Sequence, residues 1–186
     1  MTTPRLTTTE YNHLVETGVL TKDDRIELLN GVIYQKPRVT PKNSSCVMRL
    51  DRAIYQQFGS KTIISRRGPI ELPPDSEPEP DFALLRYQAD YYAEAHPSSA
   101  DILLIIEVAD SALERQRDRD IKLPIYARAG IQETWLVNLP ESRIEIYTSP
   151  ADEAYQEMRT VQREQTVESA VLPQLKLAAS DILPKS

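Results

Sequence analysis

The sequence has 186 residues, a formal net charge of −6, a single cysteine and only two histidines, His13 and His96. A lone cysteine (Cys46) excludes an internal disulfide, and so few thiol and imidazole groups argue against a zinc site, so any metal ion should have oxygen ligands. The negative balance argues against a protein that coats nucleic acid with its whole surface. No stretch reaches the roughly 18 apolar residues of a membrane span. Since the N-terminus also lacks the pattern of a signal peptide, we expect a cytoplasmic protein with no membrane partner.

The length predicts a single domain over residues 1–186, and 40% hydrophobic residues are enough for an ordinary core. Within it we distinguish an N-terminal helix and hairpin at 7–35, a core at 43–148, and C-terminal strands and a tail at 149–186.

The N-terminal part begins with a predicted short helix over Thr7–Gly18, because threonines suit its N-cap and a glycine its end. Next, the Asn30-Gly31 pair lies between two apolar runs and predicts a hairpin of strands Arg25–Leu29 and Val32–Gln35. Glu27 lies on the first strand. It is either the solvent-facing residue of an alternating strand or part of a site.

An amphipathic helix is predicted over Asn43–Phe58, where apolar residues recur at the spacing of one helical face. Thr62–Ser65 is typical of a strand. The segment Gly68–Pro80 contains five prolines, so we expect an extended connection and neither a helix nor a central strand.

Basic residues gather between positions 36 and 70, where eight lysines and arginines stand against one acid, Asp51. This stretch is either a solvated face or a local surface for phosphate groups on an acidic protein. The candidate nucleic-acid contacts are Lys42, Arg49, Arg52, Arg66 and Arg67.

Two carboxylates are predicted to meet at one end of the sheet. Ile102–Ala109 is almost wholly aliphatic, as in a strand buried on both faces, yet it contains Glu107. Asp81 directly precedes another apolar strand, Phe82–Leu85. If these strands are antiparallel neighbours, the start of one lies beside the end of the other. Two adjacent carboxylates favour a bound magnesium or manganese ion; the alternative is that Asp81 only begins a strand and Glu107 pairs with an arginine.

The chain after this strand predicts a βαβ unit. Asp110-Ser111 can cap a helix over Ala112–Ala129, and strand Glu133–Val137 should then run parallel to 102–109. Pro124 should bend this helix near Lys122, because it lacks a backbone N–H.

Lys122 shares one side of the predicted helix with Asp118 and Tyr126, at spacings of four residues. It is either an exposed ion-pair partner of Asp118, worth only a few tenths of a kcal/mol, or the third member of a site with Asp81 and Glu107. The lysine stem is long enough to reach Glu107 from the helix.

Together, Pro80-Asp81, Glu107-Val108-Ala109 and Asp118-x-x-x-Lys122 resemble the motif of the PD-(D/E)xK nuclease superfamily, with the lysine moved to the helix. More narrowly, the segments RIELLNGVIY, SEPEPDFALLR, ILLIIEVADSALERQRDRDIKLPIYARAGIQETWLVNL and RIEIY resemble a large family of restriction-endonuclease-like bacterial proteins. The chain departs from the usual pattern at Ala109, where the superfamily has its lysine, and at Asn43, where the family often has histidine.

The resemblance implies an α/β, restriction-endonuclease-like fold, in which a mixed sheet of antiparallel strands plus one parallel βαβ unit is flanked by helices. It also implies a magnesium-dependent endonuclease acting on nucleic acid, DNA in the first instance. Asp81, Glu107 and the Val108 backbone carbonyl would hold Mg²⁺ or Mn²⁺, and Glu27 could complete the metal shell. Lys122 would orient or help to deprotonate the attacking water.

Two other classes of function stay open. A catalytically degenerate member would bind nucleic acid or a partner protein through the same fold. A sugar hydrolase would need Asp81 and Glu107 about 5 to 9.5 Å apart with no cation between them. For a nuclease we expect a homodimer, because cutting both strands of a duplex usually requires two sites.

Overall fold

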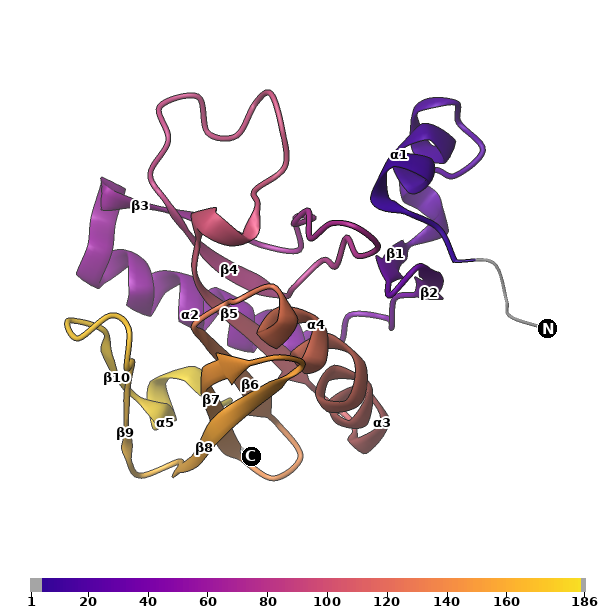
Figure 1. The fold of residues 1–186 in the computed structure, drawn as a ribbon. Helices are drawn as coiled ribbons and strands as arrows, with labels where there is room; N and C mark the ends of the chain where they lie inside the picture. Colours follow the sequence, from indigo (N-terminus) through magenta and orange to yellow (C-terminus); the bar gives the residue numbers. More distant parts are fainter. Residues whose placement is uncertain (1–4, 185–186) are drawn as a thin grey trace.

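The computed structural model describes residues 5–184 and has a six-stranded mixed sheet with helices on both faces (Figure 1). The strands lie in the order β3, β4, β5, β6, β7, β8, and only β5 and β6 are parallel neighbours. Their bounds are β3 (Thr62–Ser65), β4 (Phe82–Arg86), β5 (Ile102–Ala109), β6 (Glu133–Asn138), β7 (Arg143–Ala151) and β8 (Ala154–Gln162). The predicted fold class is confirmed.

Successive side chains of β5 point to opposite faces of the sheet, so the strand contributes to two separate apolar clusters. Leu104 and Ile106 face α2 (Pro41–Phe58), whereas Ile105 faces α4 (Leu123–Arg128). Glu107 is odd-numbered like Ile105, so its side chain points toward the α4 side. Within residues 5–184, no helix is both long and apolar enough to cross a membrane.

The N-terminal elements form a separate unit beside the sheet, at the right of Figure 1. α1 (Thr8–Glu16) begins with the predicted threonine cap, and β1 (Ile26–Leu29) pairs with β2 (Val32–Gln35) around the Asn30-Gly31 turn. The extended segment 68–80 lies against this hairpin, where the backbone N–H of Glu77 donates to the carbonyl of Leu28 at 2.7 Å. The hairpin is thereby held against the core.

The crossover between β5 and β6 is not the continuous helix predicted over 112–129. It consists of α3 (Ala112–Arg117), a π-helical turn η4 (Asp118–Lys122) and α4. Pro124 cannot donate a backbone hydrogen bond, and beside it the N–H of Leu123 donates to the carbonyl of Asp118, five residues earlier. The two residues that bound the turn, Asp118 and Lys122, are both buried.

The C-terminal segment completes the core on the α2 side. β8 pairs with β7 and so extends the main sheet, and the tail forms β9 (Thr166–Glu168), β10 (Lys176–Ala178) and α5 (Ala179–Ile182). Val167, Leu177 and Ile182 pack in the same apolar cluster as α2. The tail therefore stabilises the helix that leads into the site.

Glu133 anchors this tail from the first position of β6. Its carboxylate is fully buried and accepts hydrogen bonds from Trp135 Nε1 (2.6 Å), Ser169 Oγ (2.7 Å) and the backbone N–H groups of Ala170 (2.8 Å) and Val171 (3.0 Å). A buried carboxylate with four donors is fully satisfied, so it fixes the tail against the sheet.

The change Glu133→Ala should lower the free energy of unfolding by roughly 2–5 kcal/mol, because four buried donors lose their acceptor. Urea denaturation followed by the fluorescence of Trp135, the only tryptophan, measures this. The control is Glu168→Ala, whose exposed ion pair with Lys176 should contribute less than about 1 kcal/mol. Equal losses in the two variants would show that Glu133 is not the anchor.

Candidate active site

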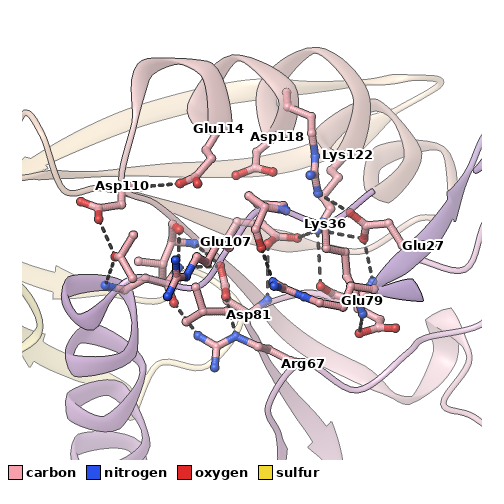
Figure 2. A pocket seen from close by; sticks show the side chains of 18 residues that line it. Glu27, Lys36, Arg67, Glu79, Asp81, Glu107, Asp110, Glu114, Asp118 and Lys122 are labelled. Carbon is pink, nitrogen blue, oxygen red and sulfur yellow. Dashed lines mark hydrogen bonds and ion pairs between the residues drawn. The ribbon is translucent and has the colours of Figure 1, made fainter. Parts of the chain in front are cut away.

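A cavity of about 180 Å³ opens at the end of the sheet where β5 and the N-terminal hairpin approach the crossover (Figure 2). Acidic and basic side chains both line this cavity. The acidic residues are Glu27, Glu79, Asp81, Glu107, Asp110, Glu114 and Asp118, and the basic residues are Arg25, Lys36, Arg38, Arg67, Arg117 and Lys122. The cavity therefore combines carboxylate oxygens with cations that can bind an anionic ligand.

Asp81 and Glu107 meet here because β4 and β5 are antiparallel, with Phe82 opposite Ile106. The backbone N–H of Asp81 points to Glu107 Oε2 at 3.4 Å, and the N–H of Val108 donates to Asp81 Oδ2 at 3.0 Å. The predicted meeting of the two carboxylates at one end of the sheet is confirmed.

Lys122 lies between two buried carboxylates. Its Nζ donates to Glu107 Oε1 at 3.0 Å, lies 3.3 Å from Glu27 Oε2 and reaches the backbone carbonyl of Glu79 at 3.4 Å. Burial acts to lower the pKa of Lys122, but the carboxylates of Glu107, Glu27 and Asp118 outweigh it and raise that pKa above its ordinary value. Lys122 is therefore a cation at neutral pH. Its interpretation as an exposed partner of Asp118 is wrong, since its side chain is 3% exposed.

Glu27 is completely buried, so its interpretation as a solvent-facing strand residue is also wrong. Its Oε1 pairs with Arg117, and its Oε2 accepts from the backbone N–H of Glu79 at 3.0 Å as well as facing Lys122. The reason for the burial is tertiary, because the extended segment that contains Glu79 covers this strand. Figure 2 shows Glu27 and Glu107 on opposite sides of Lys122.

Glu107 has a second buried partner in Tyr126, whose hydroxyl donates to Oε1 at 2.5 Å. Burial raises the pKa of Glu107 above its usual range, and the charges of Asp81 and Glu27 act in the same direction, whereas Lys122 and Tyr126 oppose them. The α4 side of the crossover thus supplies both groups that hold Glu107 in place.

Asn43 and Arg67 hold the other side of the site. The Asn43 side-chain amide donates to the Val108 carbonyl at 2.8 Å and to Asp81 Oδ2 at 3.3 Å. Arg67 Nε donates to Asp81 Oδ1 at 3.2 Å, and its guanidinium also binds Asn43 Oδ1. The sequence predicted Arg67 only as a nucleic-acid contact and Asn43 only as a residue at the family's histidine position, and it did not predict that both would bind Asp81.

The sequence placed Asp118 on the same side of the helix as Lys122, but it did not predict that Asp118 is buried. Its side chain is buried, 7% exposed, lines the cavity, and accepts no hydrogen bond from the groups that the structure describes within residues 5–184. Burial raises the pKa of Asp118 well above its ordinary value, and the charge of Glu107 adds to the shift. Lys122 turns toward other carboxylates, so the predicted ion pair with Asp118 does not form.

The five residues predicted to contact nucleic acid do not lie together on one surface. Arg67 alone lines the cavity. The other four are exposed on or near α2: Arg66 pairs with Asp51, Arg49 reaches the tail at the Asp181 carbonyl, and Lys42 and Arg52 extend from the helix. These four could meet a ligand only outside the cavity.

Asp81, Glu107 and Val108, which the sequence predicts as metal ligands, all line the cavity. Among residues 5–184, no three histidine, cysteine, aspartate or glutamate side chains form a metal-binding group. The donor set is nevertheless chemically suited to magnesium or manganese, which take hard oxygen ligands and keep several waters. Glu27 is engaged by two cations, which suits it to hold Lys122.

The mixed sheet and its paired carboxylates define a protein of the restriction-endonuclease-like class. A family model, Uma2, described as "Putative restriction endonuclease", matches residues 8–180, and the chain belongs to this family. A crystal structure of a putative nuclease belonging to DUF820 from Anabaena variabilis is similar, with a TM-score of 0.70 and 18% sequence identity; the match covers 95% of this chain and 97% of that one. The search of curated proteins found no match.

The raised pKa of Asp118 predicts a pH-dependent stability cost. A carboxyl group with a raised folded-state pKa contributes most to stability below its unfolded pKa, and this contribution is lost as pH rises through the folded value. Asp118→Asn should therefore melt about 2–4 °C above the wild type near pH 8, with the difference shrinking near pH 4.

Thermal unfolding at the two pH values, without added metal, measures this difference. Asp120→Asn removes the same charge from an exposed position in the same π-helical turn and should change the melting temperature little at either pH. If Asp118→Asn melted below the wild type at the higher pH, burial of the charged Asp118 carboxylate would not be destabilising, and the prediction would be wrong.

Proposed function

We propose that this protein is a metal-dependent endonuclease that hydrolyses phosphodiester bonds in DNA. The observation that carries the proposal is the convergence of Asp81, Glu107 and the buried ammonium of Lys122 in one cavity. Membership of a family described as a putative restriction endonuclease supports it. Cations around the carboxylates fit an anionic substrate better than a neutral sugar.

Asp81, Glu107 and the Val108 carbonyl would hold Mg²⁺ or Mn²⁺. The ion would supply Lewis-acid polarisation of the scissile phosphate. Lys122 holds Glu107 in position and places a fixed positive charge beside the phosphate, where negative charge develops. Arg67 is the cation closest to Asp81 and can exchange that carboxylate for a phosphate oxygen.

A second candidate function is a binding module without catalysis. Arg67 and Asn43 already donate to Asp81 and to the Val108 carbonyl, and in a degenerate member this arrangement would be permanent. Metal affinity separates the two candidates, because only the nuclease requires these donors to give way to a cation.

The decisive experiment is cleavage of supercoiled plasmid and single-stranded DNA with Mg²⁺, Mn²⁺ or EDTA. The wild type should cut only with metal. Asp81→Asn should reduce the rate by about 10²-fold or more and weaken Mn²⁺ binding in isothermal titration. Asp152→Asn, in an exposed turn, is the control and should behave like the wild type. Tight DNA binding by a wild type that neither binds metal nor cuts would favour the binding module.

The exposed arginines of α2 should contribute to DNA affinity through phosphate contacts. Arg52→Glu is expected to weaken binding several-fold and to make the dependence of log Kd on log salt shallower, because fewer counterions are released. Fluorescence anisotropy in EDTA at several salt concentrations measures both. Arg159→Glu, on β8, makes the same change of charge away from α2. Equal losses in both variants would mean that α2 is only a solvated face.

We further propose that two copies associate, since cleavage of both strands of a duplex usually requires two active sites. Light scattering of the purified protein, with and without duplex DNA, measures the mass of the assembly.

A further inference from the structure

Asp118 differs from every other carboxylate in the cavity. The six others each accept a hydrogen bond or pair with a cation of the described chain, through partners such as Lys36 for Glu79 and Thr40 for Asp110. Asp118 has no such partner in residues 5–184 although only 7% of it is exposed. In Figure 2 its carboxylate lies between Glu114 and Lys122 without a contact. The side chain is largely buried, and its oxygens are not among the fully buried atoms that lack a partner, so they are open to the cavity that Asp118 lines and are free to accept from a ligand there.

Lys122 cannot be the group that takes a proton from water. Its Nζ donates to Glu107 and to the Glu79 carbonyl and forms an ion pair with Glu27, and an ammonium has no lone pair. Glu107 Oε1 accepts from both Lys122 and Tyr126, and Oε2 accepts from the Asp81 N–H at 3.4 Å, so Glu107 has fewer free acceptor sites than Asp118. The base for hydrolysis must therefore come from another side chain with free acceptor sites.

We propose that Asp118 is the general base of the reaction: its carboxylate accepts a hydrogen bond from the attacking water and removes its proton. As the water oxygen bonds to phosphorus, the bond from phosphorus to the leaving sugar oxygen breaks, and that oxygen takes a proton from solvent. This assignment rests on the proposed nuclease function and identifies a further catalytic residue for it.

The surroundings of Asp118 suit this role. Glu107 on β5 and Asp81 before β4 face it with negative charge, while Lys122 and Arg117 of its own segment face it with positive charge. Burial raises the pKa of Asp118 above its ordinary value, which makes its carboxylate a stronger base than that of an ordinary aspartate. The π-helical turn begins at this residue, and such turns occur frequently at functional sites.

The test compares metal-saturated cleavage rates of the wild type, Asp118→Asn and Asp120→Asn over a range of pH. Asp118→Asn should lose about 10²- to 10⁴-fold in rate, and the wild-type rise in rate with pH should disappear. Its Mn²⁺ affinity should stay within about threefold of the wild type, as should the rate of Asp120→Asn. Added formate should restore part of the rate of Asp118→Ala, because it supplies the missing carboxylate.

Each result decides the assignment. A cutting wild type with an equally fast Asp118→Asn variant overturns the role of Asp118 and leaves the nuclease proposal intact. A parallel loss of Mn²⁺ affinity also overturns it, since Asp118 would then be a metal ligand. A wild type that cuts no DNA with any metal overturns the nuclease proposal and the base assignment together.

Discussion

The ammonium of Lys122 between Glu107 and Glu27 is the interaction on which the site depends. Three charged groups, each at most 3% exposed, come from the crossover, from β5 and from the N-terminal hairpin. Burying charges is costly, and breaking such a set by removing one partner leaves an uncompensated charge in the interior. The same contact therefore joins three distant parts of the chain and orients Glu107 toward the cavity.

The departures from the usual nuclease pattern follow from this geometry. Ala109 lies on the same face of β5 as Glu107, two residues further on, and is wholly buried against the crossover. The lysine that would occupy that position instead reaches Glu107 from the π-helical turn. Asn43, where the family often has histidine, still contacts the site, because its amide binds the Val108 carbonyl and Asp81.

The buried carboxylates of the cavity reduce the stability of the folded chain. Burial raises the pKa of both Glu107 and Asp118, so the folded chain carries an electrostatic cost at neutral pH. Arg67 and Asn43 offset part of the cost at Asp81, where their donors take the oxygens that a cation or a substrate could claim.

The sequence by itself determined most local elements, though not the π-helical turn in the crossover, and it determined the meeting of Asp81 with Glu107. Apolar periodicity, Asn30-Gly31 and the capping residues act over a few positions, and antiparallel pairing then aligns two strand ends. Only the tertiary structure decided that Glu27 is buried, because the segment covering it lies some fifty residues further along the chain. It also decided that Asp118 lacks a partner, since Lys122 turns toward Glu107 and Glu27. Such choices depend on which charges share one low-dielectric cavity, and no local pattern encodes that.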